Sequence, residues 1–361
     1  MLRAFGSPGR YVQGPGALAQ LGALAAGLGS RPLLIADPIV LALLGERLQT
    51  MLGEGFDSFR IAEFGGECSA DEIARLAAIA VACDSDFIIG LGGGKAIDTA
   101  KGVCIGRSKP LVIVPTIASN DSPTSRVAVV YDAAHVLQEV RSMQSNPDLV
   151  LVDTEVLVKA PERFFVSGVG DALSKKFEAA QCFASGGSNF YAARPPLVAQ
   201  AIADACYEVI RASAESALQA VRARTVSDAF ERTVEATILL SGLAFENGGL
   251  SMAHSLTRGF SVVPGVAQAL HGEQVAFGLL VQLVLERRPE AFIDDLVEFY
   301  GRVGLPRSLR ELGLDGEPAA AAAIIAGDTW RRAPYVKAMT GEVDPGRIEA
   351  ALLTAHRWTG S

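Results

Sequence analysis

The sequence predicts an α/β N-terminal domain with a parallel sheet, followed by an all-helical C-terminal domain. Its 361 residues are enough for two domains that each bury a core. Short apolar runs alternate with helical spacing over roughly the first 150 residues, the pattern of βαβ units. After Thr154 strand-like runs nearly disappear. We therefore expect an α/β domain over residues 1–160 and a helical domain over 161–361.

The α/β half is predicted from four apolar runs that each lead into a turn or a helical pattern. The expected strands lie within Arg31–Asp37, Ser58–Phe64, Asp86–Gly94 and Lys109–Thr116. Because most of these runs are continuously apolar rather than alternating, they are typical of a parallel sheet covered on both faces.

Helical spacing fills the gaps between these runs. It is seen over Val40–Gly53 and Ser69–Asp84, where Ser69 is a candidate N-cap and Glu72 completes a capping-box pattern. In the second half, the expected helices lie within Leu197–Glu246, Gly272–Glu286, Glu290–Gly304 and Pro345–Trp358.

Composition excludes several classes of protein. The net charge is -8 and no Lys/Arg run stands out, which argues against a nucleic-acid partner. The five cysteines are scattered without a C-x-x-C pair, so we expect reduced thiols, no thiolate zinc site and a cytoplasmic location. The N-terminus lacks an apolar signal core, and no apolar run approaches the roughly 20 residues of a membrane span.

A glycine-rich turn occupies Ile88–Val103, "IIGLGGGKAIDTAKGV". A strand followed by glycines and a helix N-terminus lets backbone N–H groups approach a pyrophosphate. The segment matches neither a Walker A loop nor G-x-G-x-x-G, so a tight turn without a ligand is the alternative. Asp37, at the end of an earlier strand, is a candidate ribose acceptor or a helix N-cap.

Polar residues crowd the end of the next strand. In an open α/β sheet, ligands bind beyond the carboxyl ends of the strands, although loops also use these residue types for ordinary turns. The cluster comprises Thr116, Ser119, Asn120, Asp121, Ser122, Thr124 and Ser125.

One of only four histidines lies in "SMAHSLTRGF", Ser251–Phe260. Its surroundings are small and apolar, so His254 is either a hydrogen-bonded core residue or a ligand.

Four motifs in order resemble the iron-containing alcohol dehydrogenase superfamily, in its glycerol dehydrogenase branch. They are "GLGGGKAIDTAK", "PTIASNDSPTS", "GVGDALSKKFEA" and "MAHSLTRGF…ALHGEQVAFG". The resemblance implies a dehydroquinate synthase-like fold, with an N-terminal dinucleotide-binding domain, a helical catalytic domain and the active site in the cleft between them.

The resemblance also implies one divalent metal per chain, bound by Asp171, His254 and His271. Alcohol dehydrogenases of the iron type have a fourth ligand, a histidine, where this chain has Lys175. Two imidazoles and one carboxylate suit zinc, with iron or manganese as alternatives. His135 and His356 match no motif of the family, and we interpret them as ordinary residues.

The implied redox cofactor is NAD, since the carboxylate of Asp37 repels the 2′-phosphate of NADP. Asp121 matches a substrate-contacting aspartate. The other implied cofactor residues are Gly93, Gly94, Lys95, Ala96, Ile97, Asp98, Thr116, Ser119, Ser125, Val127 and Tyr131.

We therefore expect an NAD- and metal-dependent homo-oligomer that oxidises glycerol, or a similar small vicinal diol, by hydride transfer. The branch commonly reads A-H-x-x-H-N-G, whereas Thr257 and Arg258 replace its second histidine and its asparagine here. Arg258 either favours an anionic substrate or points to solvent. The alternatives are a dehydrogenase of a hydroxycarboxylate or glycerol phosphate and, from another class, a non-catalytic nucleotide-binding homologue.

Overall fold

The computed structural model describes residues 2–132 and 137–358, so His135 lies outside the described residues. Those residues form two compact units. The sheet unit comprises Gly6–Pro161 and Ala220–Leu239, and the helical unit comprises Glu162–Gln219, the described residues from Leu240 onward and the N-terminal segment up to Phe5.

A six-stranded sheet forms the centre of the sheet unit, and every pairing in it is parallel. Two strands that were not predicted from the sequence, β1 (Tyr11–Gly14) and β8 (Leu149–Asp153), extend it beyond β5 (Leu111–Pro115). In spatial order the strands are β1 (Tyr11–Gly14), β8 (Leu149–Asp153), β5 (Leu111–Pro115), β4 (Phe87–Gly92), β2 (Pro32–Ala36) and β3 (Arg60–Glu63).

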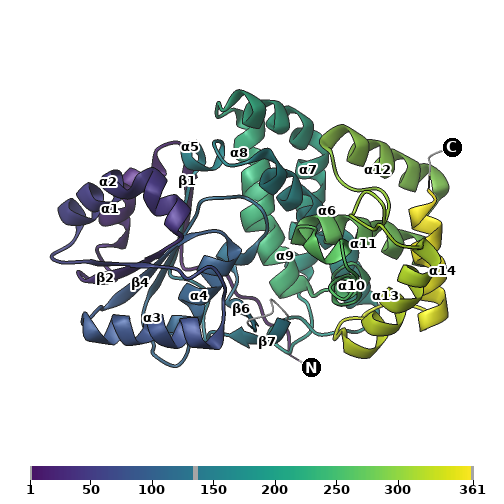
Figure 1. Ribbon diagram of the computed structural model, residues 1–361, viewed down its shortest axis with the longest axis horizontal. Coiled ribbons are helices and arrows are strands. Elements are labelled where there is room, and N and C mark those ends of the chain that lie inside the picture. The colour runs from purple at the N-terminus through teal and green to yellow at the C-terminus, as the bar shows by residue number, and fades with distance from the viewer. Residues whose placement is uncertain (1, 133–136, 359–361) are drawn as a thin grey trace. The chain divides into compact units, whose positions relative to one another are not determined.

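Helices cover both faces of this sheet (Figure 1). On one face, α1 (Leu21–Ala25), α2 (Pro38–Gly55) and the 3₁₀ turn Ala17–Gln20 pack on alternate residues of the central strands. On the other face lie α3 (Ala70–Ala82) and α4 (Gly94–Cys104). Burial on both faces explains why the central strands β2, β4 and β5 are apolar throughout.

The start of α3 confirms the predicted N-cap but not the full capping box. The side chain of Ser69 accepts a hydrogen bond from the backbone N–H of Glu72. The carboxylate of Glu72 accepts instead from the backbone N–H of Gly65 at 2.8 Å and from Arg75. The guanidinium and the preceding loop therefore take the place of the N-cap backbone as donors.

An antiparallel ribbon of β6 (Val127–Tyr131) and β7 (Leu137–Ser142) follows the 3₁₀ turn Ser122–Thr124 and was not predicted. The short helix α5 (Thr154–Leu157) follows β8. Helix α8 (Asp228–Glu235) and most of the π-helical turn Ala236–Leu240 also belong to the sheet unit. The carboxylate of Glu231 on α8 accepts hydrogen bonds from Gln13 at 2.5 Å and Thr154 at 2.6 Å, which joins α8 to the sheet.

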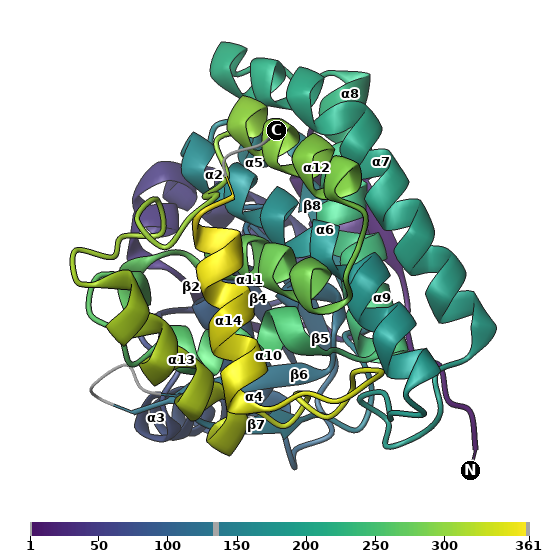
Figure 2. The ribbon, with the colours of Figure 1, turned by 90° about the vertical axis from the view of Figure 1, so that its right-hand side faces the viewer.

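The helical unit is built around α11 (His271–Leu285), which packs against α6 (Glu162–Ala184), α10 (Met252–Phe260) and α14 (Pro345–His356). Figure 2 shows α14 running in front of α11, with α13 (Pro318–Arg332) beside it. The remaining helices are α7 (Leu197–Ala223), α9 (Ser241–Gly248), α12 (Glu290–Val303), α13 (Pro318–Arg332) and α14 (Pro345–His356), and a 3₁₀ turn covers Val266–Gln268.

The predicted helical run over Leu197–Glu246 is divided into α7, α8 and α9. Ser227 caps a new helix after α7, and the π-helical turn Ala236–Leu240 separates α8 from α9. Helices α6, α10 and α13 were not predicted individually. Among the described residues, no helix is both long enough and apolar enough to cross a membrane. The predicted fold class, a parallel α/β region followed by a helical region, is confirmed.

Candidate functional site

Three helices of the helical unit bring Asp171, His254 and His271 together. Asp171 lies in the middle of α6, His254 in the first turn of α10, and His271 is the first residue of α11. One ligand atom from each residue lies within 4.8 Å of the others. The side chain of Asp171 is fully buried, whereas that of His271 is 46% exposed, so the cluster has a closed side and an open side.

Spacing along α6 places two further ionisable residues beside Asp171. Lys175 and Glu178 follow it by four and seven positions, which puts all three on one face of the helix. The ammonium of Lys175 donates to Asp171 Oδ1 at 2.5 Å and lies 3.2 Å from His254 Nε2. All three side chains are buried.

Glu178 orients His254. Its Oε1 accepts hydrogen bonds from the backbone N–H groups of Ser251 and His254 at 3.0 and 2.9 Å. Its Oε2 lies 2.5 Å from His254 Nδ1. Nδ1–H therefore donates to the carboxylate, and Nε2 faces Asp171 Oδ1 at 3.3 Å. A carboxylate that fixes a ligand histidine in this way is a frequent partner of metal sites.

Charge in the cluster shifts its pKa values. Burial alone raises the pKa of Asp171, but the positive charge of Lys175 and the hydrogen bond to His254 outweigh burial and hold the pKa well below its ordinary value. Burial lowers the pKa of His254, but the Glu178 carboxylate outweighs it and raises the pKa to about 9. Burial also raises the pKa of Glu178, but the positive charge of His254 outweighs it and lowers the pKa. Without a metal, then, both carboxylates are ionised and balanced by cationic side chains.

The cluster fits a divalent metal ion. Asp171 Oδ2 is buried and accepts no hydrogen bond from the described residues, a costly state for a carboxylate oxygen. One carboxylate oxygen and two imidazole nitrogens are ligands that zinc, iron and manganese accept, and three protein ligands leave positions open for a substrate.

A close approach of two helices places His271 beside Asp171. The backbone N–H of Gly272 donates to Ser167 Oγ at 3.1 Å. A Cβ atom at Gly272 would overlap the carbonyl oxygen of Ser167, and one at Gly170 would overlap the carbonyl oxygen of Gly272. Only glycine at both positions lets the start of α11 contact α6 so closely.

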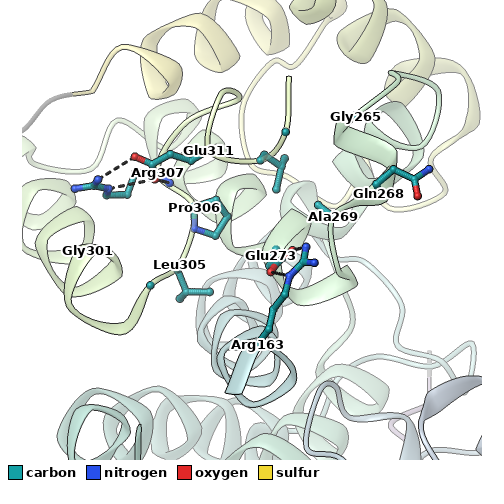
Figure 3. A pocket seen from close by; sticks show the side chains of 13 residues that line it. Arg163, Gly265, Gln268, Ala269, Glu273, Gly301, Leu305, Pro306, Arg307 and Glu311 are labelled. Carbon is teal, nitrogen blue, oxygen red and sulfur yellow. Dashed lines mark hydrogen bonds and ion pairs between the residues drawn. The ribbon is translucent and has the colours of Figure 1, made fainter. Parts of the chain in front are cut away.

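An ion pair beside this contact holds the same two helices. Arg163 on α6 binds Glu273 on α11 through two hydrogen bonds of 2.6 and 2.7 Å. Glu273 also accepts from the backbone N–H of Leu270, which caps α11. Figure 3 shows the pair at the edge of a pocket of about 570 Å³, with Arg307 and its partner Glu311 opposite.

In the sheet unit, the predicted dinucleotide residues gather at the carboxyl ends of β2, β4 and β5. Asp37 follows β2 and caps α2, its Oδ1 accepting from Ile39 N at 2.8 Å. Gly93 is the N-cap of α4 and has no side chain to occupy the free N–H groups. The backbone N–H of Thr116, just after β5, donates to Gly92 O at 3.0 Å. The structure therefore brings Asp37, the glycine turn and Thr116 to one edge of the sheet.

A buried lysine that the sequence analysis missed organises the segment before β6. Lys101 on α4 is fully buried. Its ammonium donates to the carbonyl oxygens of Ser122 and Val127, each at 2.6 Å, and to Ser125 Oγ at 3.2 Å. Asp98, one turn earlier, accepts at Oδ1 from Lys101 and Ser122 and at Oδ2 from Val129 N. Both carboxylate oxygens of Asp98 are thus engaged within the protein.

The other predicted cofactor residues differ in the backbone or side-chain groups that they can offer a ligand. Ala96 and Ile97 are buried in the first turn of α4, so Ala96 can offer a ligand only its backbone N–H, whereas the backbone N–H of Ile97 donates to Gly93 O at 3.0 Å. Lys95 is exposed, pairs with Glu67 at 2.7 Å and lies 5.5 Å from the centre of the Tyr131 ring. Two further residues lie between β5 and β6: Ser119, and the buried Asp121 at the N-cap of the 3₁₀ turn.

Glu178 was also missed as a functional residue, although it lies within the quoted motif "GVGDALSKKFEA". Its spacing of seven from Asp171 is the signal that places it on the same helix face.

Known proteins resemble this chain over nearly its whole length. Residues 8–154 match the family model described as iron-containing alcohol dehydrogenase. A glycerol dehydrogenase of Citrobacter freundii is 39% identical over 98% of this chain and 97% of its own. A glycolaldehyde reductase of Halobacterium salinarum is also 39% identical, over 98% and 97%. The crystal structure of glycerol dehydrogenase from Schizosaccharomyces pombe, 33% identical, superposes with a TM-score of 0.94 over 99% of this chain and 91% of that one.

Proposed function

Because the chain belongs to the iron-containing alcohol dehydrogenase family, we propose that it is an NAD- and metal-dependent dehydrogenase that oxidises glycerol, or a similar small vicinal diol, to the hydroxyketone. The observation that carries the proposal is the cluster of Asp171, His254 and His271, whose ligand atoms lie within 4.8 Å of one another. No structural role requires three such groups from three separate helices.

In this proposal Asp171, His254 and His271 hold the metal, which is zinc, and Glu178 keeps His254 Nε2 directed toward it. Bound there, the metal supplies a Lewis acid that lowers the pKa of the substrate hydroxyl. His271 is the most exposed of the three ligands, so its side of the cluster is where the substrate enters.

The cofactor in this proposal is NAD, bound at the carboxyl edge of the sheet. The N–H groups after Gly93 bind the pyrophosphate. Asp37 accepts hydrogen bonds from the adenosine ribose with the oxygen that does not cap α2. Asp121 holds a further hydroxyl of the substrate. NAD bound there would supply the nicotinamide ring as the acceptor of the hydride from the carbon that bears the reacting hydroxyl, and the hydroxyl proton would leave to water or through the cofactor ribose.

The test is NADH formation from glycerol and from 1,2-propanediol at alkaline pH. It is run on the purified protein, after chelation, and after zinc, iron or manganese is added back. We expect chelation to abolish activity and zinc to restore it. His271→Ala should remove turnover and leave NAD binding intact, whereas His356→Ala, a histidine on α14 outside the cluster, should change neither. Full activity of metal-free His271→Ala would overturn the proposal.

A second candidate is the reduction of glycolaldehyde, favoured by the relative of that name, whose identity to this chain is also 39%. Such a reduction uses the same groups in the reverse direction. NADH oxidation with glycolaldehyde, compared with NAD reduction by glycerol at matched enzyme concentration, ranks the two.

An anionic substrate has a specific candidate partner. Arg258 lies on α10 one turn after His254, so both project from the same side of the helix. Activity with a hydroxycarboxylate or glycerol phosphate that Arg258→Asn removes would reassign the substrate class.

A further inference from the structure

Lys175 occupies an unusual position for a lysine. Its side chain is fully buried, and its ammonium contacts two of the three metal ligands: Asp171 Oδ1 at 2.5 Å and His254 Nε2 at 3.2 Å. A buried ammonium is expensive to desolvate, so its location calls for a role that an apolar residue would not fill.

The surroundings of Lys175 explain what its charge does. Asp171 and Glu178 are two fully buried carboxylates on the same helix. The ring of Phe245 lies 5.7 Å from the ammonium and adds an aromatic neighbour. The ammonium is therefore enclosed beside the carboxylates, and it supplies positive charge where the metal's charge would otherwise be needed.

The two oxygens of Asp171 have different environments. Oδ1 accepts from Lys175, whereas Oδ2 is buried without a hydrogen-bond donor among the described residues. The carboxylate can therefore keep its ammonium partner on one oxygen and offer the other to a metal. The ammonium and the metal then share one negative charge at short range, where like charges repel strongly.

We infer that Lys175 is a tethered cation of the metal centre, which stabilises the metal-free site and weakens metal binding. It replaces part of the charge that the metal would bring, so the helical unit folds without metal and the metal exchanges more readily. This inference rests on the metal site of the proposed function, but not on the substrate.

Two variants and one control test it. Lys175→Met keeps an unbranched side chain of similar length without charge, and Lys175→Gln keeps a hydrogen-bond donor without charge. The control is Lys176→Met, which removes a lysine at the next position that pairs with Asp204 at 3.3 Å on a more exposed part of the helix. The readouts are the thermal midpoint of the metal-free protein and zinc affinity, the latter from competition with a chromophoric chelator.

We expect both Lys175 variants to lower the midpoint of the metal-free protein and to bind zinc at least about tenfold more tightly than wild type. Zinc should restore the lost midpoint, and Lys176→Met should match wild type in both readouts. If Lys175→Met folds only in the presence of zinc, that result supports the inference, and Lys175→Gln supplies the affinity.

Three results would overturn it. Unchanged zinc affinity in both variants would show that the ammonium does not oppose the metal. Weaker zinc affinity would make Lys175 a supporting group of the bound metal instead. An unchanged midpoint of the metal-free protein would remove its stabilising role. A wild-type protein that binds no zinc, iron or manganese would refute the metal site of the proposed function itself, which distinguishes that failure from a failure of this inference.

Discussion

Two replacements of Glu178 should show separately how this residue contributes to folding and how it contributes to metal binding. This residue accepts three hydrogen bonds inside the helical unit: from Ser251 N and His254 N at Oε1, and from His254 Nδ1 at Oε2. Glu178→Ala leaves two buried backbone N–H groups and one imidazole N–H without a partner. Each unpaired donor costs about 1–3 kcal/mol, so we expect the free energy of unfolding to fall by about 3–9 kcal/mol.

Glu178→Gln is the more informative change. Its carbonyl oxygen can still accept from the two backbone N–H groups, while its amide N–H₂ faces His254 Nδ1. The imidazole must then carry its proton on Nε2, the nitrogen that the metal needs. We expect only a small loss of stability, but zinc affinity about 10- to 100-fold weaker than in wild type.

The assay combines chemical unfolding of the metal-free protein with chelator competition for zinc. Glu215→Gln is the matched control, since it removes a carboxylate from an exposed ion pair with Arg302 on α12 and should change neither readout. If Glu178→Gln binds zinc as tightly as wild type, Glu178 does not select the tautomer of His254.

Three further outcomes follow from packing and burial. Gly272→Ala should lower the free energy of unfolding by about 3 kcal/mol, because the added Cβ overlaps a carbonyl oxygen of α6. Denaturant titration measures this, and wild-type stability of the variant would contradict the close approach of the two helices. Burial raises the pKa of the thiols of Cys68 and Cys104 to about 12. A thiol reagent at neutral pH should therefore label the partly exposed Cys83 rapidly and the buried cysteines only on unfolding. Rapid labelling of a second thiol in the folded protein would refute this. Lys101→Met should weaken NAD binding about tenfold, or by about 1.4 kcal/mol, in a fluorescence titration, since the segment before β6 loses its buried donor; unchanged affinity would make that segment irrelevant to the cofactor.

The fold was predictable wherever a pattern was local. The runs that form β2, β4 and β5 are apolar throughout, and Ser69 is a recognisable N-cap at the start of α3. Strand β8, "LVLVD", carries the same apolar signal and could have been found. Strand β1, by contrast, has four half-buried residues at the edge of the sheet, and its pairing partner lies far along the chain. No local pattern marks such a strand.

The metal site, by contrast, could not be predicted from any local sequence pattern. Asp171, His254 and His271 come from three helices, so no spacing in the sequence connects them, and the resemblance to a family supplied their identity. Lys175 and Glu178 could have been placed beside Asp171 from helical periodicity alone. Their roles could not, because these depend on where α10 begins relative to α6.

The origin of the ligands in three separate helices also bears on how the chain resists unfolding. An ion bound by Asp171, His254 and His271 closes two loops of the chain at once. It therefore restricts the unfolded ensemble as a disulfide does, but reversibly and without oxidation. Loop-closure entropy makes the longer of the two loops, between α6 and α10, the greater contributor. In limited proteolysis, adding zinc should slow cleavage between these helices, and a chelator should reverse that protection.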